Sequence, residues 1–235
     1  HDGVCRRLAN AGGLKVASLD YRMAPEHRAP LAAHDCLDAT RWAIEHAAEI
    51  GARTDAVGVT GDSAGGNLAA VMVPYLRDED FTGLRHQALV YPAPDLSDRE
   101  TEDLQLLTQR YPVLTPDMMR SFRSLYLGEE GDDRDPIVSP AFGDLTGLPP
   151  ALVQTAEVDP LRPDGDAYAQ ALRDAGVEVR HTTYRGAPHG YQTFPGLAPA
   201  AQPALEELIG EVAHHRLQTP RHLVAAEFGP PDQHL

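Results

Sequence analysis

One serine in this chain lies in the kind of segment that can present its hydroxyl as a nucleophile. Residues 60–70 read Thr-Gly-Asp-Ser-Ala-Gly-Gly-Asn-Leu-Ala-Ala, with Ser63 at the centre of a Gly-x-Ser-x-Gly pattern. This pattern is typical of a nucleophile elbow, a sharp turn between a strand and a helix that holds the serine in the open. The context fits, because the apolar run at 56–60 predicts a buried strand and residues 67–73 favour a helix. The alternative is a glycine-rich turn that merely contains a serine.

A serine hydroxyl needs a base to take its proton, and the base needs a carboxylate to orient it. In a parallel sheet such groups lie in loops just past the carboxyl ends of strands. His189 follows a strand predicted at 177–184, and Asp159 follows a strand predicted at 151–156. The chain order Ser63, Asp159, His189 is the one expected with a nucleophile elbow. These three residues are therefore the candidate nucleophile, acid and base.

Other titratable residues are alternatives for the same roles. His181 lies within the 177–184 strand, and His214 and His215 end the last predicted helix, where cations suit the helix dipole. On the acidic side, Glu157 lies nearer its strand and fits a structural role. The remaining two acids, Asp164 and Asp166, are expected in a first helical turn.

Strands and helices alternate along most of the chain. The predicted strands are 14–20, 56–60, 87–91, 151–156 and 177–184. The predicted helices are about 2–11, 31–50, 67–73, 115–128, 163–175 and 200–215. This alternation predicts an α/β fold, with a mostly parallel sheet that carries helices on both faces.

A single domain is expected over residues 1–216, followed by a loose tail at 217–235. Residues 93–150 are too long for a simple crossover and should carry inserted elements near the pocket. Thr115, followed by a proline and an acid, predicts the start of one inserted helix. Its predicted apolar face consists of Met118, Phe122, Leu125 and Tyr126. The helix at 31–50 should bury a face made of Ala33, Leu37, Thr40, Ile44 and Ala48.

The composition limits the classes of partner. The 235 residues carry a net charge of −15, and Lys and Arg are scattered. An acidic surface without basic stripes argues against nucleic acid or an anionic membrane as a partner. No stretch approaches the length of a membrane span. The two cysteines, Cys5 and Cys36, are expected to be small core residues rather than a disulfide or a metal pair.

The chain begins at His1, without a methionine, and its first residues already resemble the early turns of a helix. We therefore expect an N-terminal segment upstream of His1, so the lack of a signal peptide says little about location.

Four segments are similar to the hormone-sensitive-lipase-like group of bacterial α/β-hydrolase esterases, also called family IV. They are Asp-Tyr-Arg-Met-Ala-Pro-Glu at 20–26, Gly-Asp-Ser-Ala-Gly-Gly-Asn at 61–67, Asp-Pro-Leu at 159–161 and His-Gly-Tyr at 189–191. The resemblance extends over residues 1 to about 216. It implies an α/β-hydrolase fold with Ser63, Asp159 and His189 as a catalytic triad. It also implies that the Ala64 backbone N–H is one oxyanion donor and that Asp62 is structural.

Two departures from the family pattern affect the expectations. Pro163 stands where family members more often carry an acid, which a first helical turn tolerates. The His-Gly-Gly-Gly segment that supplies the other oxyanion N–H groups is absent; it and the cap helices would lie upstream of His1. The strand leading into that segment would lie between the strands at 14–20 and 56–60. We therefore expect these two strands to pair directly or to leave backbone groups unsatisfied, and we expect an open groove beside Ser63 and weak activity.

The leading functional hypothesis is a carboxylesterase that acts on short-acyl esters through an acyl-enzyme, with no metal or cofactor. The partner would be a small-molecule ester, a homodimer is possible, and the expected location is cytoplasmic. Amide or peptide hydrolysis by the same triad is a second hypothesis. A third is a non-catalytic member that binds a small ligand, as do the plant gibberellin receptors, which lack the catalytic histidine. A fourth is a fragment that is not competent alone.

Overall fold

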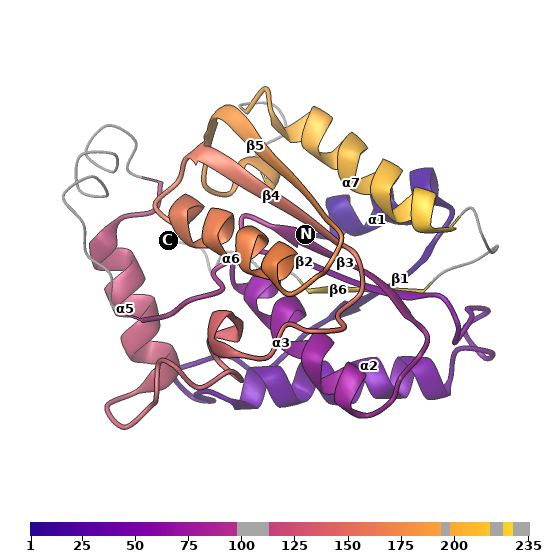
Figure 1. The fold of residues 1–235 in the computed structure, drawn as a ribbon, viewed down its shortest axis with the longest axis horizontal. Helices are drawn as coiled ribbons and strands as arrows, with labels where there is room; N and C mark the ends of the chain where they lie inside the picture. Colours follow the sequence, from indigo (N-terminus) through magenta and orange to yellow (C-terminus); the bar gives the residue numbers. More distant parts are fainter. Residues whose placement is uncertain (98–112, 194–197, 217–222, 228–235) are drawn as a thin grey trace.

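The computed structural model describes residues 1–97, 113–193, 198–216 and 223–227. In this part of the chain one parallel sheet has the strand order β1-β6-β2-β3-β4-β5 (Figure 1). Its strands are β1 (Lys15–Leu19), β2 (Val57–Asp62), β3 (Leu84–Val90), β4 (Ala151–Val158), β5 (Val179–Pro188) and β6 (Leu223–Glu227). The predicted parallel α/β fold is confirmed.

Helices cover both faces of this sheet, as Figure 1 shows. The helices are α1 (Asp2–Gly12), α2 (Leu31–Glu45), α3 (Ala64–Asp78), α5 (Pro116–Leu127), α6 (Arg162–Asp174) and α7 (Ala201–Arg216). Two short 3₁₀ turns are η1 (Pro140–Phe142) and η2 (Tyr191–Thr193). The helices α1 and α7 pack on one face, while α2, α3 and α6 pack on the other.

The central strands are apolar on both sides because both faces are covered. In β3, Leu89 packs with α2, α3 and α6, whereas its neighbours Ala88 and Val90 pack with α1 and α7. Likewise Val153 and Leu152 of β4 belong to opposite layers. This arrangement leaves the carboxyl ends of the strands as the edge at which polar groups can gather.

The position between β1 and β2 is the main correction to the sequence-based expectations. The expected tail at 217–235 contains β6, which pairs in parallel with β1 on one side and with β2 on the other. Ala225, for example, lies opposite Ala17 of β1 and Val59 of β2. The prediction that β1 and β2 pair directly or leave their backbone groups unsatisfied is therefore wrong. The physical reason is that two facing strand edges need hydrogen-bonding partners, and the short apolar run Leu-Val-Ala-Ala supplies them.

Helix α2 ends earlier than its sequence pattern predicts. After Glu45 the backbone tightens into three-residue turns, with Ala47 N–H donating to Ile44 O at 3.2 Å. This change from 3.6 to three residues per turn alters which side chains face the core. Ala47 is consequently buried, and Ala48, which was expected on the inner face, is exposed.

The inserted region carries the predicted helix, α5, near its middle. The Thr115 hydroxyl accepts a hydrogen bond from Met118 N–H at 3.3 Å, which confirms the expected N-cap. Residues 98–112 of the insertion lie outside the described residues. Neither cysteine forms a disulfide: Cys36 is buried, and burial raises the pKa of the half-buried Cys5 thiol.

Candidate active site

Ser63 lies at the turn between β2 and α3. Its φ of 56° and ψ of −116° place it in a strained backbone conformation, as the elbow pattern requires. A hydrogen bond to the neighbouring strand stabilises the turn: Ser63 N–H donates to Val90 O of β3 at 2.9 Å. Close packing also explains a glycine that the elbow pattern does not include. A Cβ on Gly66 would lie 3.1 Å from Pro92 Cα, so the helix could not approach β3 as closely with any larger residue.

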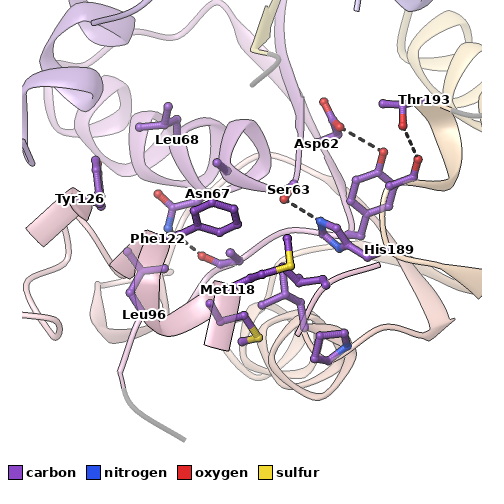
Figure 2. Close-up of a pocket in the computed structure, with 18 of the residues that line it drawn as sticks. Asp62, Ser63, Asn67, Leu68, Leu96, Met118, Phe122, Tyr126, His189 and Thr193 are labelled. Carbon is purple, nitrogen blue, oxygen red and sulfur yellow. Dashed lines mark hydrogen bonds between the residues drawn. The ribbon is translucent and has the colours of Figure 1, made fainter. Parts of the chain in front are cut away.

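The three residues singled out from the sequence lie in one hydrogen-bonded chain. Ser63 Oγ is 2.9 Å from His189 Nε2, and His189 Nδ1 is 2.7 Å from Asp159 Oδ2. Figure 2 shows the Ser63 and His189 side chains pointing toward one another. Because a carboxylate can only accept, His189 donates its Nδ1 proton to Asp159 and leaves Nε2 free to accept from the serine.

Local structure positions both partners of Ser63. Asp159 comes one residue after β4, is 1% exposed, and accepts Leu161 N–H through Oδ1 at 2.9 Å. Its second oxygen therefore points at the imidazole. His189 follows β5 directly, and Gly190 adopts a positive φ of 72° in the turn that reverses the chain.

The other residues weighed for these roles lie elsewhere or have structural partners. His181 Nε2 pairs with Asp166 Oδ1 at 3.0 Å, and Thr155 completes this cluster between β4, β5 and α6. Burial lowers the pKa of His181. Glu157 accepts Gly186 N–H at 2.7 Å and so fixes the end of β5. Asp164 lines the cavity described below, and the side chains of His214 and His215 lie outside the described residues.

A network that the sequence pattern did not indicate supports the histidine loop. Glu207 of α7 accepts hydrogen bonds from four side chains of β4 and β5, namely Gln154, Arg180, Thr182 and Tyr184. Burial raises the pKa of Glu207, but these donors lower it by more, so it lies below its ordinary value. Gln154 also accepts from the Tyr191 hydroxyl at 3.3 Å, two residues beyond His189. The network thus ties the loop to the sheet and to α7.

A cavity of about 1090 Å³ opens beside Ser63. One wall comes from α5, whose Met118, Phe122 and Leu125 side chains are 38%, 56% and 44% exposed at this surface. The apolar face predicted for this helix thus lines the pocket, and Tyr126 of the same face also packs against the core. Val4 of α1 and His1, which precedes this helix, also line the cavity.

Two features at the start of α3 complete the site. Ala64 is the first residue of the helix, so its N–H has no acceptor within the helix and lies at the positive end of the dipole. One turn on, Asn67 donates to Ala93 O and to Val138 O, both at 2.8 Å; Figure 2 labels Asn67 and shows one of these bonds. These bonds connect the start of the inserted region, at Ala93, and a later residue in it, Val138, to the helix that carries the nucleophile.

Asp62, immediately before the serine, is buried, and few hydrogen bonds or charges offset the removal of its carboxylate from water. Its Oδ2 accepts from the Tyr91 hydroxyl at 3.1 Å, and its Oδ1 lies 3.6 Å from His1 Nε2. Burial raises the pKa of Asp62 from 3.8 to about 6, although the Tyr91 hydrogen bond and nearby positive charge act in the opposite direction.

The Asp62→Asn variant is expected to be more stable than the wild type by up to about 3 kcal/mol near pH 8. The unfolded carboxyl loses its proton near pH 4, whereas the folded one keeps it until about pH 6. The free energy of unfolding therefore falls as pH rises between these values, and the cost persists above them. Urea denaturation near pH 8 and near pH 4 measures the difference, which should vanish at the lower pH. Asp144→Asn is the control, since hydrogen bonds from Thr146 lower the pKa of that exposed carboxyl; an equal gain there would contradict the prediction.

Within the described residues, no cluster of three or more His, Cys, Asp or Glu side chains has the arrangement of a metal site. The same part of the chain has no helix with the length and hydropathy needed to cross a bilayer.

The sheet, the strained serine turn and the Ser63–His189–Asp159 chain together define a class of protein. The chain belongs to the α/β-hydrolase fold family, whose sequence profile matches residues 1–193.

Among its relatives is the carboxylesterase NlhH of Mycobacterium tuberculosis, 41% identical over 212 residues, which cover 87% of this chain and 65% of that protein. The ethyl acetate hydrolase of Pseudomonas putida is 33% identical over 220 residues, 92% of this chain and 68% of the relative. An esterase structure from Pyrobaculum calidifontis superposes with a TM-score of 0.87 at 40% identity, covering 91% of this chain and 70% of that one. The chain thus spans about 65% of the length of the mycobacterial relative.

Proposed function

We propose that this protein is a serine carboxylesterase that hydrolyses short-acyl esters through an acyl-enzyme. The observation that carries the proposal is the hydrogen-bonded chain from Ser63 Oγ through His189 to Asp159, which lies at the edge of an apolar cavity. Relatives named carboxylesterase and ethyl acetate hydrolase support the reaction and a small acyl group.

The proposed reaction begins with proton transfer from Ser63 Oγ to His189 Nε2 as the oxygen attacks the ester carbonyl carbon. Asp159 keeps the imidazole in the required tautomer and stabilises the imidazolium. When the C–O bond to the alcohol breaks, His189 gives its proton to the leaving oxygen. A water molecule, deprotonated by the same histidine, then attacks the acyl carbon. The bond from this carbon to Ser63 Oγ breaks, His189 returns the proton to Ser63 Oγ, and the acid is released.

Charge develops on the carbonyl oxygen during each addition step. Ala64 N–H is the proposed donor to this oxyanion, because it follows the nucleophile at the N-terminus of α3. A single donor stabilises the oxyanion less than several do, since each donor contributes about 10²–10³ in rate. We therefore predict slow ester turnover if Ala64 N–H is the donor on which the oxyanion depends.

Two other functions remain to be separated from this one. Amide hydrolysis would use the same three residues, but it needs protonation of a poorer leaving group. A small-ligand-binding protein would need the cavity and not the hydrogen-bonded chain; the presence of His189 in that chain favours an enzyme. The homodimer and the cytoplasmic location also stay predictions.

Labelling with a fluorophosphonate tests the proposal most directly. The probe reacts only with an activated serine, so wild-type protein should be labelled at Ser63, as identified by mass spectrometry of the tryptic peptide. Heat-denatured protein is the control for non-specific reaction. If native protein is not labelled while a known serine esterase in the same tube is, the enzyme proposal fails and the binding function is favoured.

A series of p-nitrophenyl esters should reveal the size of the acyl site. Each methylene that becomes buried contributes about 0.8 kcal/mol, and this gain stops once the acyl chain reaches the wall formed by Met118 and Phe122. We expect kcat/KM to fall beyond acyl chains of about eight carbons. The rates are compared below the critical micelle concentration of each ester. A maximum with long fatty-acyl esters would indicate a lipase instead.

A further inference from the structure

Tyr91 is a buried residue next to the site that the proposed reaction does not use. It follows β3 directly, is 1% exposed, and has a positive φ of 34°. A bulky residue rarely adopts this conformation, so surrounding contacts must hold it there. One such contact is the hydrogen bond of 2.6 Å from Tyr91 N–H to Gln154 O of β4.

The ring of Tyr91 packs against the imidazole of His189. The two ring centroids lie 5.0 Å apart with an interplanar angle of 62°, an edge-to-face contact. Tyr91 also meets Tyr191, with ring centroids 4.9 Å apart and an interplanar angle of 80°. The Tyr91 ring therefore contacts both the candidate base and the residue two positions beyond it in the chain.

The hydroxyl of Tyr91 is also fixed. It donates to Asp62 Oδ2 at 3.1 Å, and Asp62 is the residue immediately before the nucleophile. Burial raises the pKa of the Tyr91 phenol well above its ordinary value, which keeps it a donor. One side chain thus connects the backbone that carries Ser63 with the ring that must accept its proton.

An imidazole held by two hydrogen bonds, one at each nitrogen, can still rock about the line that joins them. A rigid neighbour beside the ring limits this motion, and alignment of a base to better than about 1 Å can change a rate 10²-fold.

We propose that Tyr91 is a positioning residue for His189: its ring supports the imidazole laterally, and its hydrogen bond to Asp62 fixes the ring relative to Ser63. The inference rests on the proposed esterase function. It assigns Tyr91 no contact with the substrate carbonyl.

The Tyr91→Leu variant removes both the ring and the hydroxyl. We expect kcat for p-nitrophenyl acetate to fall about 10- to 100-fold with little change in KM, because orientation of the base is lost while leucine keeps an apolar side chain at this position of the cavity lining. Tyr91→Phe keeps the ring and should restore most of kcat, leaving a loss of a few-fold from the missing bond to Asp62.

Tyr168→Leu is the matched control. Tyr168 of α6 is an equally buried tyrosine, also 1% exposed, but it belongs to the core of the opposite helical layer and does not line the cavity. The same substitution there should lower stability and leave kcat unchanged at temperatures where the protein is folded.

A second readout does not depend on turnover. The proton between His189 Nδ1 and Asp159 should give a downfield ¹H NMR signal, which we expect to broaden in Tyr91→Leu and to stay sharp in Tyr168→Leu. The proposal is overturned if Tyr91→Leu keeps wild-type kcat and a sharp signal. It is also overturned if Tyr168→Leu loses kcat and the sharp signal to the same extent as Tyr91→Leu.

If Tyr91→Leu does not fold, the Tyr91→Phe variant is the test: wild-type kcat and a wild-type signal in that variant would overturn the role of the bond to Asp62. Wild-type protein without esterase activity would refute the proposed function, while the NMR comparison would still test Tyr91.

Discussion

Replacing Ser63 by alanine is expected to lower ester turnover about 10⁴-fold or more. The reason is that Ser63 Oγ is the atom that would form the acyl-enzyme, and nothing else in the hydrogen-bonded chain can replace it. His189→Ala should cause a loss of similar size. Because the two residues act on one step, the double variant should be hardly worse than either single variant. Initial rates with p-nitrophenyl acetate, after subtraction of buffer hydrolysis, measure these losses.

The control for the serine variant is a neighbouring alcohol that lies outside the site. The Thr60 hydroxyl donates to Ala88 O between β2 and β3, so Thr60→Val tests a change in the same strand without altering the reacting groups. Its activity should stay within a few-fold of the wild type. If Ser63→Ala kept more than about 1% of wild-type activity, another nucleophile would be responsible and the proposed mechanism would be wrong.

Proline at Ala225 is expected to produce the largest loss of stability. Ala225 lies at the middle of β6, with a strand on each side. Proline removes a backbone N–H, and every N–H in a central strand serves one of its two neighbours. The cost should be about 3 kcal/mol or more, a large part of the total of about 5–15 kcal/mol typical of a domain. Urea denaturation followed by circular dichroism measures the change in the free energy of unfolding.

Ala225→Ser is the matched control, because it keeps the backbone N–H and the strand geometry. It should cost far less than the proline. Equal stability of Ala225→Pro and the wild type would mean that β6 does not occupy the sheet position between β1 and β2. Equal destabilisation by serine and proline would instead point to the side chain at this position and away from the backbone bonds.

The sequence alone determined the parts of this protein whose constraints are local. The Gly-x-Ser-x-Gly pattern around Ser63 requires small neighbours and a strained turn over a short stretch of chain, so the elbow could be predicted from the residues themselves. The alternation of strands and helices also depends on residues close together in the sequence, and so does the N-cap at Thr115. Asp159 and His189 could be selected because parallel strands bring their carboxyl ends to one edge, whatever lies between them in the chain.

Only the tertiary structure decided which distant groups meet. The short run at Leu223–Glu227 has no strong pattern of its own, and it becomes a strand because the edges of β1 and β2 need partners. The apolar face of α5 is the same whether it meets core or cavity, so the exposure of Phe122 could not be predicted from periodicity. Tyr91 likewise ends an ordinary buried strand in the sequence. Its contact with His189 joins residues 98 positions apart, and contacts of that kind depend on packing, which no local pattern records.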